Sequence, residues 1–106
     1  MDINDIPMVK VTWLDAQDSD GSWTDIEDII DHEPSVCQEI GWLVHKDERK
    51  IVIMRSRIVT EDGSINEGGG HIAIPFSWVI KIDELKVNEE INNTNSIYPY
   101  QSIRTS

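Results

Sequence analysis

The 106-residue sequence has only one cysteine, Cys37, and no long apolar run. A single cysteine excludes an intrachain disulfide and favours a reducing compartment. Cys37 lies among apolar residues, which is typical of an inert buried thiol. Because the sequence lacks 18 consecutive apolar residues, we expect no membrane-spanning helix. The first residues, MDINDIP, also lack the basic and apolar regions of a signal peptide.

Basic residues are scarce as well. Nine Lys and Arg residues stand against twenty Asp and Glu residues, which gives a formal net charge of −11. Because a nucleic-acid backbone is bound through Lys and Arg, this balance argues against direct binding to DNA or RNA. It suits a protein that binds cations or that contacts a basic partner surface.

The apolar residues that are present follow a strand pattern in most of the chain. Residues 8–14 alternate, with Val9, Val11 and Trp13 on one face, which predicts a half-buried strand. Gly41 lies inside a second such run and predicts a bend, a bulge or a close approach of another backbone. This second run is 36–45, and three further runs are predicted to be strands: 50–59, 71–75 and 78–82.

One segment, residues 24–31, has the period of a helix instead. Thr24 and Glu27 have the spacing of a capping box. Pro34 then predicts the end of this short helix. Trp23, just before it, is predicted to pack against the apolar face of the helix. That face carries three isoleucines: Ile26, Ile29 and Ile30.

Together these elements predict a mainly β (α+β) fold with about five strands and one short helix. Short connections favour antiparallel neighbours, so we expect a small, strongly curved antiparallel sheet or an open barrel, SH3-like or Sm-like. We predict a single β-rich domain over residues 1–85. Residues 86–106 are polar and without period, and they predict a C-terminal tail that is either loose or docked on a partner.

The stretch DAQDSDGSWTDIE resembles a calcium loop in part. With Gly21 at the sixth position of an EF-hand loop, Asp18 and Asp20 take ligand positions, and Glu27 takes the last one. The first position is Ala16 where a carboxylate is required, and a strand precedes the loop where a helix is required. We therefore predict an acidic turn that leads into a helix, with no metal.

No other pattern points to a cofactor or to catalysis. The three histidines and Cys37 have no zinc-ligand spacing. The serines lie in no nucleophile motif. We predict a protein that is not an enzyme and that holds no cofactor.

Two sets of residues are candidates for binding. The arginines on the predicted 50–59 strand are expected to pair with carboxylates. Alternatively, together with the glycine run that follows, they form a candidate site for an anionic small molecule. The acidic turn and helix form a candidate protein-binding surface. The first set is Arg55, Arg57, Gly68, Gly69, Gly70 and His71; the second is Asp18, Asp20, Trp23, Asp25 and Asp28.

The order VTWLDA, IGWLVHKDE, IVIMRSR and IPFSWVIKIDEL resembles a group of small proteins encoded by tailed bacteriophages. The resemblance covers residues 9–85, and its most distinctive part is the IPxSWVxKIxEL ending. It implies a phage-encoded protein that acts in the host cytoplasm or is built into the virion. It carries over no functional residues.

Three hypotheses of function follow. The first is a non-catalytic protein that binds and modulates or inhibits a host or phage protein through its acidic surface, in host takeover or anti-defence. The second is a binder that sequesters a nucleotide-type small molecule, and the third is a minor virion component. We also expect a homo-oligomer, most simply a dimer, because a small sheet leaves strand edges that need cover.

Overall fold

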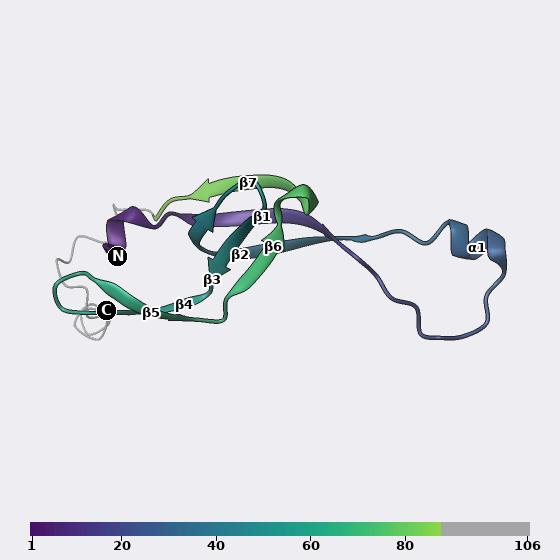
Figure 1. Ribbon diagram of the computed structural model, residues 1–106, viewed down its shortest axis with the longest axis horizontal. Coiled ribbons are helices and arrows are strands. Elements are labelled where there is room, and N and C mark those ends of the chain that lie inside the picture. The colour runs from purple at the N-terminus through teal and green to yellow at the C-terminus, as the bar shows by residue number, and fades with distance from the viewer. Residues whose placement is uncertain (88–106) are drawn as a thin grey trace, which may run out of the picture.

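The computed structural model describes residues 1–87 and is mainly β (Figure 1). A 3₁₀ turn, η1 (Ile3–Asp5), precedes the first strand, and a second, η2 (Phe76–Trp78), precedes the last. The only α-helix in this range is α1 (Ile26–Ile30). The strands are β1 (Met8–Asp15), β2 (Ser35–Lys46), β3 (Lys50–Met54), β4 (Ser56–Val59), β5 (Ile65–Gly69), β6 (Ile72–Pro75) and β7 (Val79–Leu85).

The strands form two antiparallel sheets. Five of them make a sheet in the order β6-β3-β2-β1-β7, and β4 and β5 make a separate two-stranded ribbon. Strands β1 and β2 pair along their whole shared length, from Met8 opposite Trp42 to Asp15 opposite Ser35. The segment between these two strands therefore starts and ends at the same place on the sheet.

The predicted antiparallel, mainly β fold with one short helix is confirmed, but the predicted strong curvature or open barrel is wrong. Neither sheet closes or curls strongly, and the edge strands β6 and β7 are not joined. The predicted strand 50–59 is interrupted at Arg55, so its second half leaves the main sheet as β4. There it pairs with β5, a strand that the sequence analysis missed, with Ser56 opposite Gly69.

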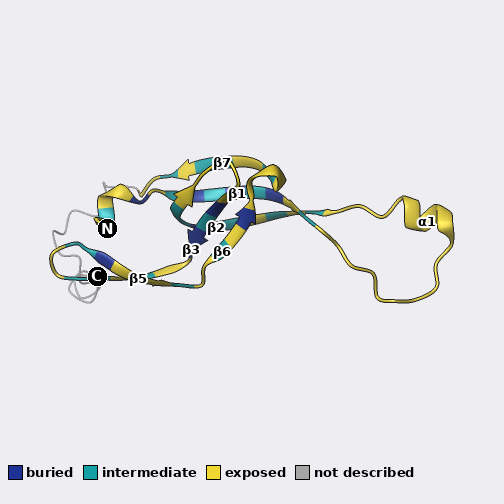
Figure 2. Ribbon diagram, viewed as in Figure 1, coloured by how far each residue is buried: buried dark blue, intermediate teal, exposed yellow. Residues whose placement is uncertain are grey.

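The main core lies on one face of the five-stranded sheet. Figure 2 shows buried residues in dark blue on β1, β3 and β6. The alternation predicted for the first strand is confirmed, because its three apolar residues at odd positions are all buried. Each side chain of this kind contributes about 1.5–3 kcal/mol on full burial. The core residues are Val9, Val11, Trp13, Ile51, Ile53 and Ile74.

A second, smaller core joins the ribbon to the N-terminal segment. Ile6, Met54 and Ile65 are buried there. The backbone N–H of Ile65 donates to the Met1 carbonyl at 2.7 Å, and Asp2 pairs with Ser64. These contacts hold the ribbon against the start of the chain.

Gly41 is the point of close backbone approach that the sequence predicts. A Cβ atom at this position would lie 2.6 Å from the Met54 carbonyl oxygen and would collide with Ile53. The register between β2 and β3 shifts just beyond it, between Leu43 and His45. Glycine therefore lets two neighbouring strands pack together where any other residue would push them apart.

Residues 15–34, which we call the acidic arm, project from the end of the sheet (Figure 1). The arm makes the molecule long, with extents of 60 × 34 × 22 Å. Every residue from 16 to 34 is exposed (Figure 2). The helix predicted at its tip forms, but it covers no part of either sheet.

The predicted local contacts of this helix are wrong. Its N-cap is Asp25, which makes no side-chain cap bond, and the Thr24 hydroxyl donates to the Ser22 carbonyl instead of capping the helix. Trp23 packs against nothing. A helix of five residues at the end of two extended segments has no core within reach to cover.

Strand β7 ends at Leu85. Residues 88–106 of the predicted tail lie outside the described residues. Among residues 1–87, no helix is both long enough and apolar enough to cross a membrane.

Candidate functional site

The acidic arm concentrates the negative charge of the protein. No Lys or Arg occurs between Lys10 and Lys46. The arm holds eight of the twenty acidic residues, while the other twelve share the rest of the chain with all nine basic residues. The eight carboxylates are Asp15, Asp18, Asp20, Asp25, Glu27, Asp28, Asp31 and Glu33.

Hydrogen bonds within the arm shape the turn before the helix. The Asp20 carboxylate accepts from the backbone N–H of Ser22 at 2.9 Å and from the Ser22 hydroxyl at 2.6 Å. Gly21 between them has a φ of 84°, in the left-handed region that glycine adopts without strain. The bonds from Ser22 lower the pKa of Asp20, so this carboxylate stays ionised below its ordinary range.

One contact ties the outgoing and returning halves of the arm together. The Nε2 atom of His32 lies 2.9 Å from the carbonyl oxygen of Gln17, to which it donates. A cavity of about 460 Å³ lies beside this contact, and Asp28 and Ile29 are among its lining residues. This contact links the start of the arm to the residues that follow its helix.

Four apolar side chains at the tip of the arm face solvent. The exposed fractions are 103% for Trp23, 69% for Ile26, 52% for Ile29 and 74% for Ile30. On burial, side chains of this size would each contribute about 1.5–3 kcal/mol. Trp23 gives the fold none of this energy, and the three isoleucines give only part of it, so folding does not account fully for these residues.

The predicted protein-binding residues all lie on the arm, and all are exposed: Asp18, Asp20, Trp23, Asp25 and Asp28. The sequence analysis missed the three isoleucines as surface residues, because it described their face only as the one against which Trp23 packs. The signal that could have placed them was the absence of any basic residue from position 11 to position 45 together with the shortness of the helix. Within residues 1–87, no three His, Cys, Asp or Glu side chains converge on a point where a metal ion would fit.

The structure places the residues of the predicted small-molecule site in separate environments. Arg55 pairs with Glu39 on β2, with Nη2 2.9 Å from Oε2, and its Nη1 donates to the Gly70 carbonyl at 3.2 Å. This is the carboxylate pairing that the sequence analysis expected for the arginines. An exposed ion pair of this kind contributes about 1 kcal/mol or less. His71 is exposed and does not line the cavity beside His32.

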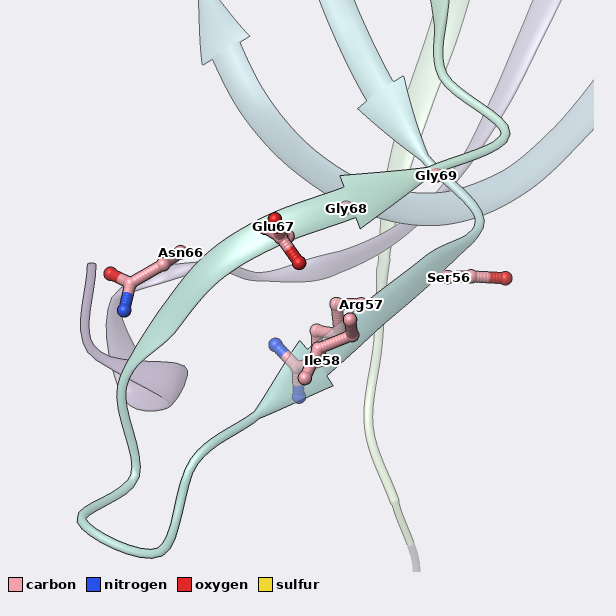
Figure 3. Close-up of a pocket in the computed structure, with 7 residues that line it drawn as sticks. All are labelled: Ser56, Arg57, Ile58, Asn66, Glu67, Gly68 and Gly69. Atoms are coloured by element: carbon pink, nitrogen blue, oxygen red, sulfur yellow. The ribbon is translucent and has the colours of Figure 1, made fainter.

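Arg57 occupies a different environment. Its guanidinium carbon lies 4.2 Å from the centre of the Trp42 ring, a cation–π contact between the ribbon and β2. Nη1 is buried without a hydrogen-bond partner, and burial lowers the pKa of Arg57. Gly68 lies opposite Arg57 in the ribbon. These two residues and Gly69 help to line an open groove of about 610 Å³ (Figure 3).

Comparison of the chain with family models, curated proteins and solved structures finds no match. Any functional assignment therefore depends on the residues and their geometry. On these grounds the acidic arm is the stronger candidate, because it combines charge, exposed apolar surface and projection from the fold.

Proposed function

We propose that this protein is a non-catalytic, phage-encoded binding module that inserts its acidic arm into a basic cleft of a host or phage protein. Occupation of the cleft modulates or inhibits the partner. The proposal depends on one observation. The arm presents Trp23 and three isoleucines among eight carboxylates, and it gives no residue to the core. Apolar side chains that folding leaves in water are accounted for by a partner that buries them.

The two kinds of residue have separate tasks in such a complex. The carboxylates attract a basic surface from a distance and speed association, an effect that salt weakens. Trp23 and the isoleucines supply the contacts that slow dissociation, because binding energy concentrates in a few buried aromatic and aliphatic anchors. A cleft that normally binds nucleic acid carries the Lys and Arg residues that this arm complements.

An arm-shortened variant tests the proposed function. Asp15 and Ser35 face each other in register, so an Asn-Gly turn can replace residues 16–34 and leave both sheets intact. Immobilised full-length protein is expected to retain a partner from host lysate at low salt and to release it at high salt. The arm-shortened variant is expected to retain none. Equal retention by both proteins would assign binding to another surface.

The ribbon groove supports a second candidate function, the binding of an anionic nucleotide-type molecule. Its volume lies within the range of small-molecule sites. A ligand that binds the native state raises the melting temperature. Thermal unfolding with nucleotides at millimolar concentration tests this candidate, and an unchanged melting temperature with every nucleotide would eliminate it.

A further inference from the structure

Building on the function proposed above, we propose that the acidic arm binds as an amphipathic helix that begins at Trp23. This helix lies in an apolar groove of the partner that is flanked by Lys and Arg. In the free protein the helix begins only at Ile26, so binding lengthens it by about one turn.

The spacing of the exposed apolar residues indicates a single helical stripe. Trp23, Ile26 and Ile30 stand at positions i, i+3 and i+7, which lie on one face of an α-helix. Ile29 lies at the edge of that face. Peptide helices that bind in apolar grooves place their anchors at this spacing. In the free arm the stripe is incomplete, because Trp23 lies outside the helix.

The residues before the helix are suited to extend it. Asp25 has a φ of −63° and a ψ of 144°, so its φ is already helical and its ψ is extended. With Ser22 as the new N-cap, Asp25 falls three residues later, the spacing of a capping box. Asp25, Glu27 and Asp28 would then lie near the positive end of the helix dipole. A helix this short is marginal alone, so contacts in the groove must stabilise it.

Charge identifies the chemistry of the partner. The stripe is bordered by carboxylates on a segment without any Lys or Arg, so the groove must offer basic residues at its rim. A second copy of this chain suits this need poorly. Its Arg55 and Lys81 are paired with Glu39 and Asp83, and its acidic residues outnumber its basic ones.

Site-specific photocrosslinking in host lysate identifies the partner. Benzoylphenylalanine replaces Trp23 in one full-length protein and, as a matched control, replaces Ile58 in another. Ile58 is also exposed, but it lies on β4, away from the arm (Figure 1). We expect a crosslink from position 23 and none from position 58, to a partner peptide that contains apolar residues and Lys or Arg.

The purified partner then allows a test of the helix. Trp23→Ala, Ile26→Ala and Ile30→Ala are each expected to weaken binding about tenfold or more, whereas Ile29→Ala has a smaller effect. Asp25→Pro suits the observed φ of Asp25 and leaves α1 in place, but it disfavours a helical conformation at Thr24. It is expected to weaken binding about tenfold, while Asp25→Asn, which removes the same charge, changes it by less than about threefold.

Amide hydrogen exchange measures the helix directly. In the bound protein the amides of Ile26 and Glu27 would donate to the carbonyls of Ser22 and Trp23, so their exchange is expected to slow on binding. Unchanged exchange together with full binding by Asp25→Pro would overturn the helical mode and leave the proposed function standing. A partner that binds without any contribution from the arm would overturn both. A crosslink from position 23 to a second copy would reassign the arm to self-association.

Discussion

The five-stranded sheet and the acidic arm use the same residue types in opposite ways. In the sheet, isoleucine and tryptophan are buried on one face, and Ile51 and Ile53 are completely inaccessible to solvent. In the arm, isoleucine and tryptophan are exposed and carboxylates surround them. The sheet shares its acidic residues with basic ones, whereas the arm has no basic residue.

This difference separates the residues that stabilise the fold from those that remain for a partner. Hydrophobicity alone does not distinguish the two groups, because Ile53 and Ile30 are the same residue type. The two isoleucines differ in whether other apolar residues lie close enough to cover the side chain. β3 lies inside the sheet between β6 and β2, and its isoleucines belong to the main core, whereas α1 lies at the end of two extended segments (Figure 1).

The largest difference is expected from truncation of matched isoleucines. Ile53→Ala removes a fully buried side chain and should lower the free energy of unfolding by about 2–5 kcal/mol. Ile30→Ala, its control in the arm, should change it by less than about 0.5 kcal/mol. Urea denaturation measures both. A loss above 1 kcal/mol for Ile30→Ala would mean that the arm contributes to the stability of the fold.

A glycine pair tests the packing within the sheets. Gly41→Ala places a methyl group against the Met54 carbonyl and Ile53, so it should destabilise the protein by about 1–3 kcal/mol. Gly69→Ala is the control, because a Cβ atom at that position meets nothing within 4 Å. Thermal unfolding compares the two variants. Equal melting temperatures would contradict the close approach of β2 and β3.

Removal of the whole arm should have a small effect on stability. The variant in which an Asn-Gly turn replaces residues 16–34 loses no buried residue and closes a shorter loop between β1 and β2. Its free energy of unfolding is expected to lie within about 1 kcal/mol of the full-length value. Cooperative unfolding by circular dichroism checks this. A non-cooperative transition would show that the sheet depends on the arm.

Acid should act on the sheet and the arm through particular carboxylates. The His45 side chain and the backbone N–H groups of Lys50 and Arg49 hold the pKa of Asp47 well below its ordinary value of 3.8, and Ser22 lowers the pKa of Asp20. A lowered pKa in the folded state means stability that is present above pH 3.8 and lost as pH falls through the folded value. Asp47→Asn is therefore expected to weaken the acid dependence of unfolding. NMR titration that gave ordinary pKa values for both carboxyls would contradict these hydrogen bonds.

The outer face of the sheet resembles the arm in one respect, because it leaves apolar residues exposed. Leu14, Val36, Ile40 and Ile80 lie on β1, β2 and β7, with Leu14 directly opposite Val36. This exposure supports the predicted dimer. Light scattering is expected to give a mass above 12.1 kDa, and Ile40→Lys is expected to lower it. A mass of 12.1 kDa at every concentration would contradict the predicted dimer.

Period-two alternation predicted most of the main sheet from the sequence. Residues 8–14 became β1, and the predicted strand 36–45 became β2. Strand β5 was not predictable in this way, because Gly68 and Gly69 carry no side chain that could alternate. The sequence also could not show that the sheet does not form a barrel. Local patterns do not indicate where a strand such as 50–59 is interrupted.

The candidate site was predicted in part. The acidic residues and Trp23 were predicted as a binding surface from charge and composition alone, and the structure places them together on the arm. The isoleucines were not predicted as exposed, because the amphipathic period of a helix shows that one face is apolar and not what covers it. Only the position of the helix relative to the sheet separates these two outcomes.

The central claim is that the acidic arm carries the binding function. Titration calorimetry with the partner that photocrosslinking identifies tests this claim most directly. The purified partner is titrated into the full-length protein and into the arm-shortened variant, with cooperative unfolding of the variant as the control for its fold. We predict a measurable affinity for the full-length protein, weaker at high salt, and no binding by the variant. Equal affinity for the two proteins would contradict the assignment of function to the acidic arm.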